Sequence, residues 1–180
     1  MKKVIIYTDG ACKGNPGDAS IGVVISEEDG TLIKEIGEYI GKTTNNVAEY
    51  TALIRGLTEA VEVGATEVVI NTDSELMARQ LSGVYKVKSP NIKPLFDIAV
   101  SLLRRFSRVS ISHVLREFNK RADELANEGI RKRNFMPQAS PSQSANNTRP
   151  ITEKPIHTSN QVSENQPAEA ANPAQCELEF

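Results

Sequence analysis

Segments with a strand-like pattern of apolar and polar residues alternate with segments that have a helix-like pattern along the first 132 residues. Short continuous or alternating apolar runs are typical of strands, and turn residues such as Glu28, Asp29 and Gly30 separate them. The strands predicted in this way are residues 3–8, 20–27, 31–40, 67–72 and 108–115.

Other segments repeat their apolar residues at the three-to-four spacing of an α-helix. Between residues 46 and 63 this spacing places Tyr50, Leu53 and Leu57 on one face, and Gly64 provides a stop. The helices predicted in this way are residues 46–63, 74–81, 92–106 and 119–131.

The order of these elements predicts the sheet. Three successive strands form an antiparallel meander, and the two later strands are reached through helices, which makes them parallel to the first strand. We therefore expect an α/β fold with a five-stranded mixed sheet, an antiparallel meander plus two parallel strands, flanked by helices. Ligand sites in such sheets form at the carboxyl ends of the parallel strands.

Composition changes after Lys132. Six of the nine prolines and none of the eleven glycines lie beyond it, among Ser, Asn, Gln, Ala and Thr residues with almost no apolar pattern. Such a segment buries too little surface to offset the entropy lost on ordering. We predict a folded domain over residues 1–132 and a disordered polar tail over residues 133–180, whose partner the sequence does not identify.

Charge and cysteine content exclude several classes of protein. Residues 1–132 carry 18 of the 21 basic and 18 of the 23 acidic residues, so any nucleic-acid site must come from local clustering. Cys12 and Cys176 are the only cysteines, and they provide neither a disulfide framework nor a zinc site. No stretch is apolar enough for a membrane span or a signal peptide. We expect a soluble, cytoplasmic monomer without a membrane partner.

Four acidic residues are candidates for a catalytic site. Asp9 and Asp73 follow two strands that are predicted to be parallel neighbours, whereas Glu49 and Asp123 lie near the starts of two helices. Each residue also has a purely structural interpretation. Asp9 could be a turn residue, and Asp73 could cap a helix. Glu49 could be an exposed helical residue, and Asp123 could interact favourably with the dipole of its helix. Together, the four can meet at one edge of the sheet.

Four carboxylates in one place repel one another and raise each other's pKa unless cations neutralise them. Oxygen ligands of this hardness suit Mg²⁺, with Mn²⁺ as an alternative. Two such ions about 4 Å apart can activate water and stabilise both oxygens of an in-line phosphoryl displacement. The combination predicts a metal-dependent phosphodiesterase.

Four motifs then give a family resemblance. Residues 7–17 (YTDGACKGNPG), 43–50 (TTNNVAEY), 72–76 (TDSEL) and 119–127 (NKRADELAN) are similar, in order and spacing, to the signature segments of type 1 ribonuclease H. The match covers essentially all of residues 1–132. It implies the ribonuclease H-like fold and endonucleolytic hydrolysis of the RNA strand of an RNA/DNA hybrid, which leaves 5′-phosphate and 3′-hydroxyl ends.

The resemblance also implies roles for the carboxylates. Asp9 would bridge two metal ions, and Asp123 would help to hold the ion that activates the attacking water. Glu49 and Asp73 would hold the ion that faces the leaving oxygen.

Substrate contacts are implied for residues that also have structural interpretations. Pro16 and Gly17 stand where a type II turn places them, and Thr and Asn are ordinary helix caps, although a helix amino terminus is also a phosphate site. The contacts implied by the resemblance are Gly10, Cys12, Asn15, Thr44, Asn45, Asn46 and Ser74. Lys86 and Lys88, on a predicted loop, either contact phosphate or form a solvated face.

The chain departs from the family pattern before the last aspartate. Many relatives carry a histidine on that loop, whereas residues 114–119 hold none and His113 falls within the last predicted strand. The resemblance implies that Arg116 or Glu117 takes its place, and Arg116 joins the candidate catalytic residues.

Two alternative functions stay open. The same fold could be a nucleic-acid-binding module without catalysis, because function is a property of the site and not of the fold. It could also be a broader nuclease that cuts DNA or structured RNA. The complete set of four carboxylates favours cleavage, and Asn15, Asn45 and Asn46 favour hybrids.

Overall fold

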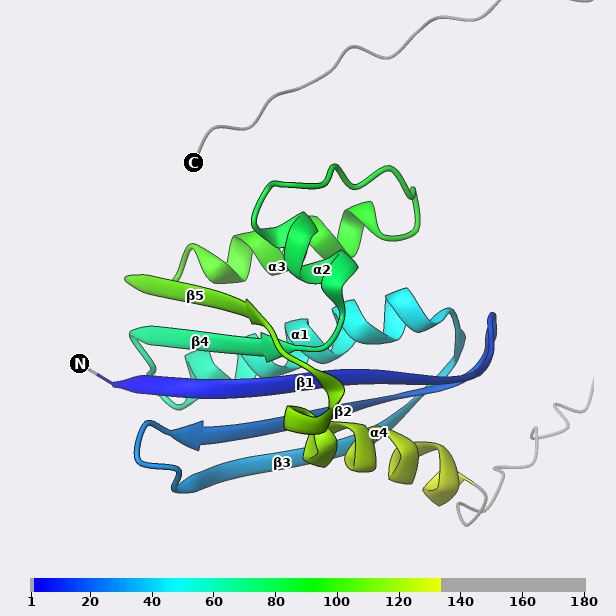
Figure 1. Ribbon diagram of the computed structural model, residues 1–180, viewed down its shortest axis with the longest axis horizontal. Helices are drawn as coiled ribbons and strands as arrows, with labels where there is room; N and C mark the ends of the chain where they lie inside the picture. The colour runs from blue at the N-terminus through cyan, green and yellow to red at the C-terminus, as the bar shows by residue number, and fades with distance from the viewer. Residues whose placement is uncertain (1, 134–180) are drawn as a thin grey trace, which may run out of the picture. The chain divides into compact units, whose positions relative to one another are not determined.

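Five strands form one sheet in the computed structural model, in the order β3-β2-β1-β4-β5 (Figure 1). The structure describes residues 2–133, so residues 134–180 of the predicted tail lie outside the described residues. The strands are β1 (Lys3–Gly14), β2 (Gly17–Glu27), β3 (Leu32–Thr43), β4 (Glu67–Thr72) and β5 (Arg108–His113). The pairs β1–β2 and β2–β3 are antiparallel, and the pairs β1–β4 and β4–β5 are parallel. The predicted mixed sheet is confirmed.

Helices account for most of the remaining described residues. They are α1 (Asn45–Glu62), α2 (Glu75–Leu81), α3 (Lys93–Leu103) and α4 (Lys120–Arg133), with a 3₁₀ turn η1 (Arg116–Phe118). All four predicted helices are present, and α3 is shorter than predicted at its carboxyl end. The turn η1 was not predicted, because three residues are too few for an apolar period to show.

Helices α1 and α4 pack on opposite faces of the sheet (Figure 1). Gly56 of α1 faces Ile6 and Val23, and a methyl group added at Gly56 would lie 2.8 Å from the Ile6 side chain. Gly22 precedes Val23 in β2 and therefore faces the other way, against the backbone of Ala122 in α4. The glycines allow both helices to lie close to the strands.

Strand β1 is longer than predicted. Its parallel pairing with β4 ends at Thr8 and Thr72, where the apolar run also ends. Its antiparallel pairing with β2 continues as far as Gly14. The prediction that Asp9 follows the strand is therefore wrong, since Asp9 lies within β1, one residue beyond the point where its β4 neighbour stops.

The turn between β1 and β2 also differs from the prediction. A type II turn with Pro16 at its second position needs a positive φ at Gly17, but the glycine with a positive φ here is Gly14, at 87°, so the predicted type II turn is not formed. Asn15 Oδ1 accepts a hydrogen bond of 3.2 Å from the backbone N–H of Asn45. The turn is thereby joined to the start of α1.

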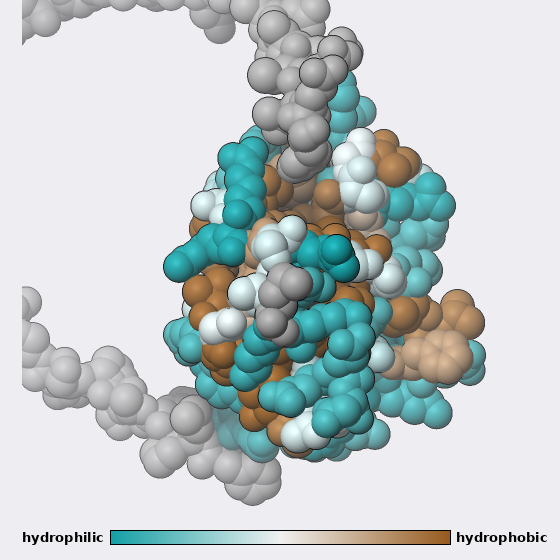
Figure 2. Space-filling view, turned by 90° about the vertical axis from the view of Figure 1, so that its left-hand side faces the viewer, coloured by the Kyte–Doolittle hydropathy of each residue, from teal (hydrophilic) through white to brown (hydrophobic). Residues whose placement is uncertain are grey.

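The end of the molecule at which β1 begins is covered largely by hydrophilic side chains, with apolar groups between them (Figure 2). Ion pairs join Lys2 to Glu27 at 3.8 Å and Lys3 to Glu28 at 2.6 Å. Exposed pairs of this kind contribute at most about 1 kcal/mol each. None of the helices in the described part of the chain is long and apolar enough to cross a membrane.

Candidate active site

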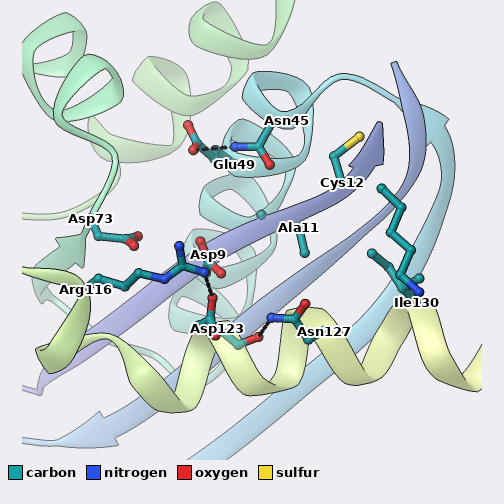
Figure 3. A pocket seen from close by; sticks show the side chains of 12 residues that line it. Asp9, Ala11, Cys12, Asn45, Glu49, Asp73, Arg116, Asp123, Asn127 and Ile130 are labelled. Atoms are coloured by element: carbon teal, nitrogen blue, oxygen red, sulfur yellow. Dashed lines mark hydrogen bonds and ion pairs between the residues drawn. The ribbon is translucent and has the colours of Figure 1, made fainter. Parts of the chain in front are cut away.

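A pocket of about 280 Å³ opens beside Asp9, where β1 continues past the end of its pairing with β4 (Figure 3). Its lining includes the four candidate carboxylates, Asp9, Glu49, Asp73 and Asp123. They come from β1, from α1, from the junction of β4 with α2, and from α4. As predicted, the four side chains lie around one pocket. Their chemical roles stay predictions.

Asp9 lies at the centre of the electrostatics of the pocket. The pKa of Asp9 is raised to about 7, chiefly by burial and then by the negative charges of Asp73, Asp123 and Glu49 in that order, while a hydrogen bond from the Gly10 backbone opposes the shift. Near neutral pH this carboxyl group is therefore partly protonated unless a cation lies beside it.

Glu49 is held by two neighbouring side chains. Ser74 Oγ donates a hydrogen bond of 2.5 Å to one carboxylate oxygen, and Asn45 Nδ2 donates one of 2.9 Å to the other. Burial raises the pKa of Glu49, and the hydrogen bond from Ser74 opposes that shift. The exposed helical position that was an alternative for Glu49 is excluded, and Ser74 and Asn45 have structural roles that the sequence did not indicate.

Asp123 is paired with Arg116. The Arg116 guanidinium, at the start of η1, donates a hydrogen bond to Asp123 Oδ1 and lines the pocket (Figure 3). The carboxylate raises the pKa of Arg116. The Arg116 side chain is 74% exposed and lines the pocket, so the pair lies at the mouth of the pocket.

Asp73 is held by Asn119, a residue that the sequence analysis did not select. Asn119 Nδ2 donates a hydrogen bond of 2.9 Å to Asp73 Oδ1. Asn119 stands directly before α4, where a helix cap is expected, so its position in the sequence does not indicate another role. The cap of α2 is Ser74, which excludes the alternative that Asp73 serves this purpose.

The donor set fits hard divalent cations. Four carboxylates around one polar pocket are the oxygen ligands that Mg²⁺ and Mn²⁺ prefer, and the raised pKa of Asp9 marks a place where positive charge is stabilised. Within residues 2–133, no three His, Cys, Asp or Glu side chains converge closely enough to hold one ion between them. An ion held by three of these carboxylates would therefore need their side chains to rotate from the positions seen here.

The residues predicted to contact substrate divide into two groups. Gly10, Cys12 and Asn45 line the pocket, and Ser74 adjoins it through Glu49. A methyl group added at Gly10 would lie 2.4 Å from the backbone nitrogen of Glu49, so only glycine fits between β1 and α1. Cys12 Sγ donates to the carbonyl of Gly14 at 2.6 Å.

The second group lies outside the lining of the pocket. Thr44 caps α1 by accepting a hydrogen bond from the Val47 backbone, and Asn46 is exposed in the first turn of that helix. Asn15 is bonded to the start of α1, as described above. Lys86 and Lys88 are exposed on the loop after α2 and do not line the pocket. Substrate contact by these residues stays a prediction.

Comparison with known proteins gives consistent matches. A family model described as "Reverse transcriptase-like" matches residues 7–129. The chain is 42% identical to ribonuclease HI of Halobacterium salinarum over 128 residues, 71% of this chain and 64% of that protein. It is 34% identical to ribonuclease H of Marinobacter nauticus, with 73% of this chain and 97% of that protein covered. A bifunctional protein of Mycobacterium tuberculosis is 44% identical over 129 residues, but the match spans only 35% of its length.

Solved structures give the same result. The RNase H1 of the halophilic archaeon Halobacterium salinarum has a TM-score of 0.70 at 42% identity, with 72% of this chain and 98% of that chain covered. An RNase H1 isolated from compost, solved in complex with an RNA/DNA hybrid, has a TM-score of 0.70 at 48% identity, with 73% of this chain and 99% of that chain covered.

Proposed function

The chain belongs to the type 1 ribonuclease H family, and we propose that it hydrolyses the RNA strand of RNA/DNA hybrids with the help of two divalent metal ions. The observation that carries this proposal is the single pocket that Asp9, Glu49, Asp73 and Asp123 line together. The solved complex of a 48% identical relative with an RNA/DNA hybrid supports the choice of substrate.

The four carboxylates would hold the ions. Asp9, which has the three other carboxylates as neighbours, would help to hold both ions, while Asp123 would help to hold one and Glu49 and Asp73 the other. Bound Mg²⁺ supplies Lewis-acid activation of a water molecule and neutralises charge on the phosphodiester. The expected products carry 5′-phosphate and 3′-hydroxyl ends.

The chain's own residues would orient the hybrid. The turn at Asn15 and the start of α1 at Asn45 are linked by a hydrogen bond, so they would meet the substrate as one surface next to the carboxylates. The N–H groups at the first turn of α1 carry a partial positive charge that favours phosphate. Recognition of the RNA strand would use its 2′-hydroxyl groups.

The test compares three substrates in Mg²⁺, namely an RNA/DNA hybrid with labelled RNA, duplex DNA and duplex RNA. We expect cleavage of the hybrid alone, with 5′-phosphate ends on the fragments and no cleavage in excess EDTA. An Asp123→Asn variant purified in parallel controls for contaminating nucleases. Cleavage of all three substrates would indicate a broader nuclease, and binding without cleavage would indicate a binding module.

Replacing Arg116 by Ala should separate turnover from metal binding. We expect kcat to fall about tenfold to a hundredfold, because a positive charge at the mouth of the pocket is lost. The concentration of Mg²⁺ that gives half-maximal activity should fall, because Asp123 no longer has the guanidinium as a competing partner. Steady-state kinetics over a range of Mg²⁺ concentrations measures both quantities.

A matched control is Arg121→Ala. Arg121 lies five residues further along the chain, pairs with Glu35 at 2.7 Å and does not line the pocket of the four carboxylates. This variant should keep both kcat and the Mg²⁺ dependence of the parent. Equal behaviour of the two variants would contradict a specific role for Arg116.

A further inference from the structure

We propose that Asn119 is a positioning residue that sets the orientation of Asp73 and thereby the affinity of the pocket for divalent cations. This inference rests on the proposed function in assuming that the carboxylates bind metal. It concerns an amide that is 1% exposed and does not line the pocket.

Asn119 contacts the three chain segments that carry Asp9, Asp73 and Asp123. Its Nδ2 donates to the carbonyl of Thr8 at 3.0 Å and to Asp73 Oδ1 at 2.9 Å. Its backbone carbonyl accepts a hydrogen bond of 3.1 Å from the N–H of Asp123. One residue therefore fixes the spacing between the end of the β1–β4 pairing, the start of α2 and the first turn of α4.

The orientation of the Asn119 amide is determined by its neighbours. Both groups that face Nδ2 are acceptors, so the reversed amide would place Oδ1 against two oxygens. Asn119 Oδ1 is buried and has no hydrogen-bond partner among the described residues. An unpartnered buried oxygen destabilises a fold, so stability alone does not explain an amide at this position.

A neutral donor suits this position for an electrostatic reason. A lysine or arginine would also hold Asp73, but its charge would neutralise the carboxylate and oppose cation binding. The amide occupies Oδ1 of Asp73 and adds no charge to the cluster. Side chains that orient metal ligands in this way commonly change metal affinity about tenfold to a hundredfold when they are lost.

The test measures Mg²⁺ binding to Asn119→Leu by isothermal titration calorimetry on the full chain without nucleic acid. Leucine has the same branching and the same number of heavy atoms as asparagine but is bulkier and has no donor, and Asn119→Ala serves as a second, smaller variant if the first does not fold. Circular dichroism gives the folded fraction and the Tm. We expect Mg²⁺ affinity per folded molecule to fall at least about tenfold. In hybrid cleavage, kcat should fall while KM stays near that of the parent.

Gln80→Met is the matched control. Gln80 is also a buried amide, 8% exposed, and it accepts a hydrogen bond of 2.8 Å from Tyr50. Its loss should lower the Tm and leave Mg²⁺ affinity unchanged. Parent-like Mg²⁺ affinity in the folded Asn119 variants would overturn this inference alone. Absence of Mg²⁺ binding by the parent chain would overturn the metal-dependent part of the proposed function and this inference with it.

Discussion

Replacing Asp9 by Asn should abolish hybrid cleavage and, without metal ions, stabilise the folded protein at pH 8. The loss of activity should be at least about a thousandfold, because Asp9 is the carboxylate next to all three others. The gain in stability follows from removing a half-buried negative charge that three like charges surround. We expect at least about 1 kcal/mol, since a pKa shift of one unit corresponds to about 1.4 kcal/mol.

The stabilisation by Asp9→Asn should depend on pH. The folded-state pKa of Asp9 is raised from 3.8 to about 7, so both folded and unfolded chains are protonated at this residue below pH 3.8. Between those two pH values Asp9 ionises in the unfolded chain but stays largely protonated in the folded one, so the parent protein loses stability as the pH rises. Above about pH 7 this loss of stability reaches its full size. The advantage of the variant should therefore be small near pH 4 and largest above pH 7. Urea denaturation in EDTA at several pH values measures it.

Asp29→Asn is the control for this prediction. Asp29 is exposed in the turn between β2 and β3, where hydrogen bonds from Thr31 lower its pKa. Its replacement should not stabilise the protein at pH 8 and should leave hybrid cleavage intact. A stability difference between Asp9→Asn and the parent that does not change with pH would contradict the electrostatic explanation.

Replacing Gly22 by Ala should unfold the domain or reduce its stability by more than about 3 kcal/mol. The added methyl group would lie 1.9 Å from the carbonyl oxygen of Ala122 and 2.7 Å from the backbone nitrogen of Ala126. Both atoms belong to the backbone of α4 and move only if the helix does. Because Asp123 follows Ala122, displacement of α4 should also lower hybrid cleavage by any folded fraction.

Gly30→Ala is the control for the same substitution without steric overlap. Gly30 has a φ of 88° and no atom within 4 Å of an added methyl group, so only backbone strain opposes the change. We expect a loss of about 1 kcal/mol and full activity. Equal stability losses for the two variants, measured by urea denaturation, would contradict the close packing of α4 on β2.

Local sequence patterns determined the order and type of the main elements. Residues 67–72 form β4 with the predicted bounds, and the helix predicted at residues 46–63 is α1, shifted by one residue. Apolar residues repeat about every two positions in a half-buried strand and every 3.6 positions in a helix. These repeats can be recognised in the sequence because they involve only neighbours along the chain. The places of Asp9, Glu49, Asp73 and Asp123 beside predicted strands and helices likewise indicated a shared site, and the family motifs contain all four.

Tertiary structure decided how these carboxylates are held. Asp9 lies inside β1 because β2 continues alongside after β4 has ended. Ser74 donates a side-chain hydrogen bond to Glu49, 25 positions away in the sequence. Asn119 donates one to Asp73, 46 positions away. A local pattern records only the preference of a residue for a helix cap or a turn. The partner that its side chain finds depends on which distant segments the folded sheet places beside it.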